Sequence, residues 1–451
     1  MDAYGRLYRR VLYPFYESVV RRRTTLAKLR EVEASEHFSH ERLVAMQMTA
    51  LRELVAHAAA NVPFYRERLA GIDPRSLRTR SDLLRLPLLT RNDAQESSET
   101  RRSLVPPFVE ITKSTSGSTG KPVAFGYERD SEDWRQAIRL RAYAWAGYQP
   151  GMRTFHFWGV GAKPPSRLKQ LKIELDHRLR RDWFTDSASR APARLDEVIT
   201  ELKRFRPEVI VCFTTAGADL ARRVLATNAR DWGTIPVICG AEALFAPDRA
   251  ALEAAFGPAV FETYGSRETM LLGAECSAHA GLHVPMENVI VEVLVEENGT
   301  YRHAAPGESG DVAVTDLHNR AMPFLRYLNG DRAVAIDETP CACGRAHERL
   351  PSIDGRVTAV LRDRAGAPVG GLFVNVVMAP LGRTVDAFQV VQHADDSVTM
   401  KLVKGTTYDD TVCPKIVAGF RRFLGEVPLT IELVDAIPVG RNGKRQVILR
   451  D

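Results

Sequence analysis

Between residues 194 and 264, short apolar runs alternate with longer segments in which apolar residues recur every three or four positions. Short apolar runs are typical of buried strands, and the longer periodic segments are typical of amphipathic helices. Alternating strands and helices predict a parallel sheet with helices on its faces. The expected order is a strand at 154–158, a helix from 195, a strand at 209–213, a helix from 216, a strand at 235–239, a helix from 249 and a strand at 260–264.

The pattern changes twice after this region. From 284 to 331, apolar and polar residues alternate between glycine-containing turns, which predicts a smaller β subdomain. Beyond 356, the pattern predicts a small α+β unit with strands at 387–392 and 397–403, a helix over about 409–424 and a strand at 429–434. We therefore predict an α/β protein with two domains, residues 1–355 and 356–451.

The N-terminal third is expected to be mainly helical. In the basic first 30 residues, Leu7, Val11, Phe15 and Val19 fall at helical spacing, which Pro14 interrupts. Such a helix could bind a membrane surface or a partner. We favour a helix that lies against the protein body, because arginines commonly form solvated faces. A second helical pattern runs over 41–69, and a further helix through residues 134, 138 and 142 is expected to be capped by an aspartate at 130.

Composition narrows the class of protein. The 451 residues are 45% apolar and 26% charged, as in soluble globular proteins. The formal charge of +6 is small and no dense basic stripe exists, so nucleic acid is not an expected partner. No stretch approaches a membrane span, and the N-terminus lacks the apolar core of a signal peptide. Six scattered cysteines make no disulfide framework, which predicts a reducing, cytoplasmic location.

The segment 111–123, I-T-K-S-T-S-G-S-T-G-K-P-V, carries the most distinctive chemistry. The largely apolar stretches 108–111 and 123–125 predict two strands that this segment joins tightly. Glycines let N–H groups turn toward an anion, and hydroxyls and ammonium groups complete a phosphate cradle. The candidate phosphate-binding residues are Ser114, Thr115, Ser116, Gly117, Ser118, Thr119, Gly120 and Lys121. A flexible Ser/Gly linker is the alternative. The spacing of the glycines excludes a Walker A loop.

This loop resembles the phosphate-binding signature of the adenylate-forming superfamily, which contains acyl-CoA synthetases and related AMP-forming ligases. The sequence is more similar to the phenylacetate–CoA ligase-like family, especially to its branch associated with capsular polysaccharide biosynthesis. The resemblance extends from about Gln47 to the C-terminus. It implies a large N-terminal adenylation domain and a small mobile C-terminal domain.

Three further segments resemble nucleotide-contacting elements of the superfamily. Tyr264-Gly265-Ser266-Arg267-Glu268 fits Y-G-x-x-E, in which the tyrosine would stack on adenine and the glutamate would hold Mg²⁺. Gly240-Ala241-Glu242 resembles the adenine-contacting segment. The segment 326–331 resembles R-Y-x-x-G-D, whose aspartate, Asp331, would accept hydrogen bonds from the ribose hydroxyls. Without the resemblance, each segment would be interpreted as an ordinary turn.

Two cationic residues complete the implied catalytic set. Gly355-Arg356 resembles the Gly-Arg near the interdomain hinge, where the guanidinium would reach ribose and phosphate. Lys444, in a glycine-flanked basic segment, resembles the adenylation lysine and would neutralise charge on the transferring phosphoryl group. A solvated basic tail is the alternative for Lys444. The residues at 357–359 are not acidic, so an acidic hinge residue cannot be assigned.

Two groups of cysteine and histidine, about sixty-five residues apart, are compatible with a closed Cys₃His zinc site. The C-x-C turn supplies Cys341 and Cys343, and the earlier segment supplies Cys276 with either His279 or His283. The family resemblance favours His283, and the zinc would be structural. Reduced, unliganded cysteines are the alternative interpretation. Cys212, Cys239 and Cys413 are expected to be packing residues.

We therefore predict an AMP-forming carboxylate ligase that uses ATP and Mg²⁺, makes an acyl-adenylate and transfers the acyl group to a thiol, with CoA as the expected co-substrate. Transfer to an amine, an amino acid or a carrier protein is the second interpretation, and a non-catalytic nucleotide-binding protein is the third. The family places its acyl pocket at strand ends occupied here by Trp158, Phe213, Phe245 and Met270. An aromatic or medium-sized apolar acid would suit them. A homodimer is one alternative for the oligomeric state.

Overall fold

A computed structural model describes residues 2–115, 122–159, 166–187, 191–242, 244, 246–353, 360–366, 368–370, 372–405, 408–437 and 448–450. Several sequence-predicted site residues lie outside the described residues: 116–121 of the glycine-rich loop, Phe245, Arg356 and Lys444. Their assignments stay predictions.

The largest sheet has eight strands in the spatial order β14-β9-β8-β7-β6-β5-β3-β4. Strands β4, β3, β5, β6 and β7 pair in parallel, and β8, β9 and β14 extend the sheet with antiparallel pairing. The strands are β3 Thr154–Trp158, β4 Asp182–Asp186, β5 Val209–Phe213, β6 Val237–Gly240, β7 Val260–Ser266, β8 Met270–Glu275, β9 Leu282–His283 and β14 Arg349–Leu350.

Helices cover both faces of the parallel part, because alternate residues of a strand point to opposite faces. Ile210 and Cys212 of β5 join the core under helices α9, α10 and α11. Val209 and Val211 join the opposite core, which contains the last turn of helix α7. The helices concerned are α3 Thr25–Ser35, α7 Arg129–Trp145, α8 Arg167–Arg180, α9 Pro192–Phe205, α10 Thr214–Ala226 and α11 Ala246–Phe256.

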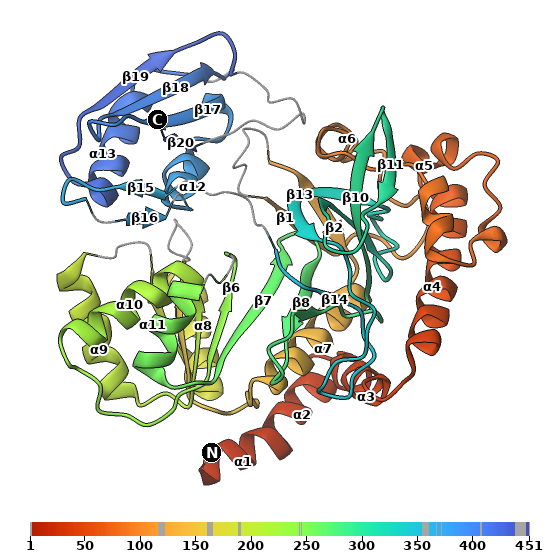
Figure 1. The fold of residues 1–451 in the computed structure, drawn as a ribbon, viewed down its shortest axis with the longest axis horizontal. Helices are drawn as coiled ribbons and strands as arrows, with labels where there is room; N and C mark the ends of the chain where they lie inside the picture. The colour runs from red at the N-terminus through yellow and green to blue at the C-terminus, as the bar shows by residue number, and fades with distance from the viewer. Residues whose placement is uncertain are drawn as a thin grey trace.

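A second sheet forms the β subdomain, with antiparallel strands in the order β11-β10-β12-β13. Its apolar residues Ile290, Leu317 and Leu325 pack against the long helix α4 and its neighbours. Figure 1 shows these helices on the outer side of the β subdomain. The elements are α4 His40–Asn61, α5 Pro63–Arg68, η3 Pro74–Ser76, η4 Arg80–Arg85, α6 Arg91–Glu96, β1 Ile111–Ser114, β2 Ala124–Tyr127, β10 Val289–Glu297, β11 Thr300–His303, β12 Ser309–Asp316 and β13 Tyr327–Val334.

The C-terminal region has a hydrophobic core of its own, to which Phe373, Val390, Ile416 and Phe420 belong. Its sheet has the order β19-β18-β17-β20, and Figure 1 shows it as a separate body beside the main sheets. The elements are β15 Val360–Arg362, β16 Pro368–Gly370, α12 Leu372–Met378, η5 Ala379–Thr384, β17 Val385–Gln392, β18 Val398–Lys404, α13 Val412–Leu424, β19 Leu429–Leu433 and β20 Ile448–Arg450.

The predicted fold class is confirmed, with corrections at element ends. The strand before the glycine-rich loop begins at Ile111 and not at Phe108, whose side chain is exposed. Pro106 and Pro107 cannot donate to a strand ladder, which delays the start of pairing. Helix α7 begins at Arg129, so Asp130 lies in its first turn and does not cap it.

Residues 3–20 are helical, but the apolar row does not face the protein. The run consists of α1 Ala3–Leu7, the π-helical η1 Tyr8–Leu12, α2 Tyr13–Phe15 and the π-helical η2 Tyr16–Val20. Gly5, Tyr8 and Glu17 are its buried residues. Leu7, Val11, Phe15 and Val19 are 49–57% exposed, so the expected helix against the body packs through its other face. Among the described helices, none is sufficiently long and apolar to cross a membrane.

Candidate functional site

The two ends of the glycine-rich loop are held together by a short β-hairpin. Ser114 of β1 pairs with Ala124 of β2 in an antiparallel register. One residue further, Thr115 N donates to Val123 O at 3.0 Å, and Val123 N donates to Thr115 Oγ1 at 2.9 Å. The threonine hydroxyl predicted to face phosphate therefore also closes the base of the loop. A hairpin of this kind agrees with the predicted tight connection between two strands.

Two sequence motifs that are 67 residues apart meet at Tyr264. The Tyr264 hydroxyl donates to Asp331 Oδ2 at 3.0 Å and accepts from Asn329 Nδ2 at 2.8 Å. Asp331 N also donates to the side-chain oxygen of Asn329 at 2.9 Å. Tyr264 and Asp331 are each 8% exposed. The residues predicted to contact adenine and ribose are thus neighbours in one hydrogen-bonded group.

Glu268 is held in place by residues that the sequence analysis did not select. The Tyr327 hydroxyl donates to Glu268 Oε1 at 3.1 Å. Arg135 Nη1 donates to the main-chain oxygen of Glu268 at 2.6 Å, and the guanidinium also pairs with Asp316. Glu268 is buried to 3% exposure. Its carboxylate therefore has a fixed position next to the loop base.

Arg91, the first residue of α6, connects Glu268 to the glycine-rich loop. Its Nη1 lies 3.9 Å from Glu268 Oε1, and its Nη2 donates to Thr115 Oγ1 at 3.3 Å. A guanidinium at this position adds permanent positive charge where phosphates are expected. The sequence offered no local signal for Arg91, because its role depends on contacts with residues far away along the chain.

The carboxyl ends of the parallel strands bring Gly240, in the segment predicted to contact adenine, next to Trp158 and Phe213. The rings of Trp158 and Phe213 have centroids 4.2 Å apart. A Cβ on Gly240 would lie 2.8 Å from Thr263 Oγ1 and 3.4 Å from the Trp158 ring, so the close packing requires glycine. Glu242 accepts from Thr215 N at 3.0 Å, which fixes the turn against the start of α10.

Gly265 and Met270 lie at the β7–β8 connection. A Cβ on Gly265 would come within 2.0 Å of the main-chain oxygen of Met270, so glycine is required in this paired register. Met270 itself has a φ of +67°. Of the predicted acyl-pocket residues, Trp158 and Phe213 are in direct ring contact, and Phe245 lies outside the described residues.

Cys276, His283, Cys341 and Cys343 form one cluster in which all ligand atoms lie within 4.8 Å of one another. The sulfurs of Cys276 and Cys341 are 3.8 Å apart, and Cys343 Sγ lies 3.4 Å from His283 Nε2. Tetrahedral Zn²⁺, with bonds of about 2.3 Å to sulfur and about 2.0 Å to nitrogen, requires S···S and S···N separations of about 3.8 and 3.5 Å. The donor set and its spacing therefore fit zinc.

His279, the competing candidate, is turned away from the cluster. Its Nδ1 lies 3.2 Å from Glu275 Oε1, and its side chain is 36% exposed. His283 is buried, and burial lowers its pKa to about 3, which keeps the imidazole neutral as a ligand must be. A second group, His40, Glu338 and Glu348, also has clustered ligand atoms, but Glu348 already pairs with Arg80.

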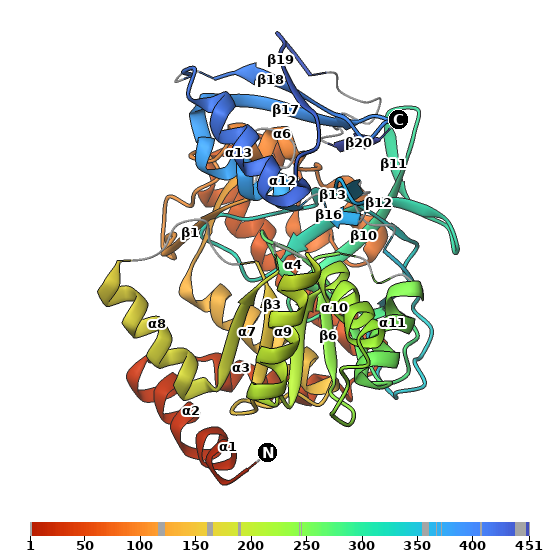
Figure 2. The same ribbon diagram turned by 90° about the vertical axis from the view of Figure 1, so that its left-hand side faces the viewer.

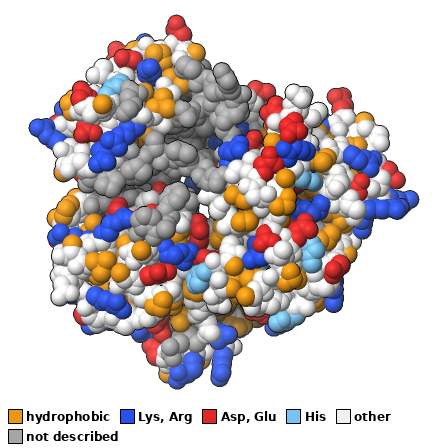
Figure 3. All heavy atoms as spheres, in the orientation of Figure 1, with side chains coloured by type: hydrophobic (Ala, Val, Ile, Leu, Met, Phe, Trp, Pro, Cys, Tyr) orange, Lys and Arg blue, Asp and Glu red, His pale blue; other side chains and the backbone are white. Residues whose placement is uncertain are grey.

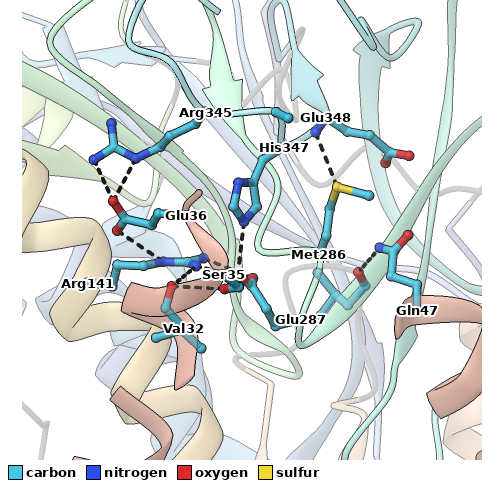
Figure 4. A network of polar contacts seen from close by, with 12 residues as sticks. Val32, Ser35, Glu36, Gln47, Arg141, Met286, Glu287, Arg345, His347 and Glu348 are labelled. Atoms are coloured by element: carbon cyan, nitrogen blue, oxygen red, sulfur yellow. Dashed lines mark hydrogen bonds and ion pairs between the residues drawn. The ribbon is translucent and has the colours of Figure 1, made fainter. Parts of the chain in front are cut away.

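A buried polar network anchors the segment that carries the cysteines (Figure 4). Arg345 donates to Glu36 Oε2 at 2.8 Å, which ties the C-x-C turn to the end of α3. Arg141 of α7 and His347 both contact Glu287, at 3.1 Å for Arg141 Nη2 and 2.9 Å for His347 Nε2. Burial alone would raise the pKa of Glu287, but the Arg141 guanidinium and His347 lower it well below its usual range. The network holds two helices and the cluster segment in one arrangement.

Comparisons with known proteins agree in family and fold. A family model described as the CapK C-terminal domain matches residues 362–451. A phenylacetate–coenzyme A ligase of Thermus thermophilus is 28% identical over 414 residues, which cover 89% of this chain and 87% of that enzyme. Protein CapK of Staphylococcus aureus is 22% identical over 422 residues, covering 91% and 89%.

A crystal structure of 2-hydroxyisobutyryl-CoA ligase in the postadenylation state, in complex with R3-HIB-AMP, has a TM-score of 0.59 to this chain. The two share 18% sequence identity, and the match covers 92% of this chain and 91% of the other. At this level of identity the likeness concerns the fold.

Proposed function

We propose, from the premise that this chain belongs to the phenylacetate–CoA ligase-like family of adenylate-forming enzymes, that it is an ATP-dependent, AMP-forming acid–thiol ligase. The observation that carries the proposal is the meeting of four separate segments: Tyr264 with Asp331, and Glu268 with Arg91 and Thr115. Together these groups offer a ribose acceptor, a metal-binding carboxylate and positive charge beside a loop rich in phosphate donors.

In the proposed reaction, the substrate carboxylate attacks the α-phosphorus of ATP, the bond to the β-phosphate oxygen breaks, and acyl-adenylate and pyrophosphate form. Positioning and charge neutralisation supply most of the acceleration in such transfers. Asp331 would hold the ribose, and the glycine-rich loop would hold the outer phosphates. Mg²⁺ bound by Glu268 would neutralise phosphate charge, and Tyr327 would keep that carboxylate oriented.

The catalytic cations come from three parts of the chain in this proposal. Arg91 lies beside Thr115 and is suited to the departing pyrophosphate. Arg356 and Lys444 would act from the hinge and the C-terminal domain, which we propose begins at about residue 356. The separate hydrophobic core of the C-terminal region and the family-model match to 362–451 support this division. Movement of the domain between half-reactions would withdraw Lys444 after adenylation.

We propose CoA as the acyl acceptor, since relatives that match 72–89% of this chain are named as coenzyme A ligases. An amine, amino-acid or carrier-protein acceptor is the second candidate, and the CapK-type C-terminal match is the observation that favours it. The acid is proposed to be aromatic or medium-sized and apolar. The paired rings of Trp158 and Phe213 at the strand ends support that choice.

We also propose that the Cys/His cluster holds one structural Zn²⁺ through Cys276, His283, Cys341 and Cys343. Zinc bound there would cross-link the segment after β8 to the C-x-C turn. Four protein ligands leave no open position, so the site has no direct part in the reaction. None of the six cysteines forms a disulfide, which supports a reducing, cytoplasmic location.

Acid-dependent exchange of labelled pyrophosphate into ATP tests the adenylation step. A panel of aromatic and medium-sized apolar acids should contain at least one that stimulates exchange, and omission of Mg²⁺ should abolish it. Product analysis with CoA and with amines then identifies the acceptor. Absence of exchange with every acid, in protein that binds ATP, would favour a nucleotide-binding protein without catalysis.

A further inference from the structure

Helix α8 presents an apolar row to solvent. Leu168, Leu171, Leu175 and Leu179 are spaced by three or four residues, so they share one side of the helix. They are 82, 63, 59 and 47% exposed. The helix has no fully buried residue, and it contacts β4 through the stacking of His177 on Phe184, at a centroid distance of 4.4 Å. One side of a fourteen-residue helix is therefore apolar and uncovered.

The N-terminal helical run presents a second exposed row: Leu7, Val11, Phe15 and Val19. A spacing of four drifts around an α-helix of 3.6 residues per turn. The wider turns of the π-helical stretches η1 and η2 offset this drift, so the row stays on one side. The opposite side packs on the protein through Gly5 and Tyr8, which leaves the apolar row outward.

The two helices are joined where α8 ends. The Tyr4 hydroxyl donates to Leu179 O at 2.9 Å, and Arg181 donates to both carboxylate oxygens of Asp2 at 2.8 Å. Figure 2 shows α8 beside α1 and α2 at one edge of the molecule. We call the four leucines of α8 and the N-terminal row together the two-helix face.

Positive charge borders the two-helix face. Most of the exposed charged side chains in and next to these two helical segments are basic, and two are acidic, Asp2 and Glu174. The basic ones are Arg6, Arg9, Arg10, Arg21, Arg22, Arg167, Lys169, Lys172 and Arg178. Figure 3 shows basic side chains gathered at the lower tip of the molecule, where the N-terminal helix lies. On α8, a wheel of 100° per residue places Arg167 and Arg178 on one flank of the leucine row and Lys172 and Lys169 on the other.

We propose that the two-helix face binds the surface of a membrane that contains anionic phospholipids. An apolar side flanked by Arg and Lys is the arrangement of helices that lie in the lipid interface, with leucines among the acyl chains and cations at the headgroup phosphates. A second copy of this chain is a poorer occupant, because a self-complementary interface would bring like-charged flanks together. The inference does not depend on the proposed catalytic function.

Sedimentation of the full chain with vesicles tests the proposal. The chain should bind vesicles of phosphatidylcholine with about 30% phosphatidylglycerol, and bind pure phosphatidylcholine much more weakly. Raising the salt concentration should weaken binding to the anionic vesicles, because the charges involved are exposed. Leu171→Asp with Leu175→Asp should reduce the partition coefficient at least about tenfold, because two exposed apolar side chains are lost from the lipid contact.

A matched control is Leu225→Asp with Leu433→Asp, which replaces leucines that are 44 and 49% exposed on α10 and β19. This control should bind vesicles like the wild type, and both variants should keep the wild-type circular dichroism and pyrophosphate exchange. Absence of sedimentation with anionic vesicles at low salt overturns the proposal. An equal loss of vesicle binding in the control variant overturns it as well. So does the finding that the wild type is a dimer and the α8 variant a monomer, while neither protein binds vesicles.

Discussion

Replacing Cys341 with serine tests the metal assignment at a residue whose side chain is only 5% exposed. A serine hydroxyl has nearly the size of the thiol but does not ionise to a metal ligand under ordinary conditions, so a strong Zn–S bond is lost. The wild-type chain should keep close to one zinc per molecule after dialysis against a weak chelator, and the variant should lose it. Stability should fall with the metal, because metal-binding free energy at a structural site is folding free energy.

The loss of stability should approach the full zinc-binding free energy, because the cluster is already arranged to bind the metal. The donor atoms already have S···S and S···N separations of 3.8 and 3.4 Å. The turn is fixed by Gly344 N, which donates to Cys341 O at 2.9 Å, and by the Arg345–Glu36 ion pair. At a free zinc concentration about 1,000 times the dissociation constant, binding contributes about 4 kcal/mol. The melting temperature should then fall by at most about 8 °C, since 1 kcal/mol shifts a unit of about 250 residues by roughly 2 °C and longer chains by less.

The assay combines metal analysis by mass spectrometry with thermal unfolding at a fixed zinc concentration. Cys413→Ser is the matched control, because Cys413 is a half-buried thiol outside the cluster. His283→Ala should lose zinc, whereas His279→Ala should keep it. Purified wild-type protein without zinc and with a melting temperature that zinc does not raise would refute the reasoning. Equal zinc loss in Cys341→Ser and Cys413→Ser would refute it as well.

Three further predictions concern the ATP site. Lys444→Ala should lower pyrophosphate exchange at least about 100-fold while calorimetry still detects ATP binding, and wild-type exchange would contradict the assignment. Gly117→Val should weaken ATP binding far more than AMP binding in calorimetry, because valine would restrict the backbone of a loop that is proposed to hold the outer phosphates, which AMP lacks. Equal loss of both would indicate a general role in folding. Tyr327→Phe removes a hydrogen bond to Glu268 and should raise the Mg²⁺ concentration for half-maximal exchange about tenfold, whereas Tyr301→Phe, at an exposed hairpin, should not.

The central strands of the parallel sheet could be predicted from sequence because each is a short apolar run, and the observed β5 Val209–Phe213 has the predicted bounds. The edge strand β4, with the sequence DWFTD and mostly exposed or half-buried residues, has no such run and was not predicted. The N-terminal helix shows the limit of this reasoning. Its spacing predicted a helix, but the side that packs was decided by Gly5 and Tyr8, which approach Gly151 closely and are not the most apolar residues of the run.

Part of the candidate nucleotide site could also be predicted from the local sequence pattern. Every second residue of a strand points to the same face. The assignment of Asp331 on β13 therefore implied that Asn329 and Tyr327 lie on the same face of the strand. The observed hydrogen bonds to Glu268 and Tyr264 use those residues. Arg91 could not be found in this way. It precedes Thr115 by 24 residues, and only the packing of α6 brings the two side chains together.

The metal cluster and the nucleotide residues are close in the sheet although they are far apart in function. His283 of β9 pairs with Ala274 of β8, and the preceding residue Gly273 pairs with Tyr264 of β7. His283, a proposed zinc ligand, therefore lies two strands from the tyrosine that is hydrogen-bonded to Asp331. A metal that fixes β9 and the C-x-C turn also limits the movement of β8, on which the register of Tyr264 depends. The proposed zinc would thus support the proposed catalysis through the sheet, as a brace for the strand that carries Tyr264, without contacting any reactant.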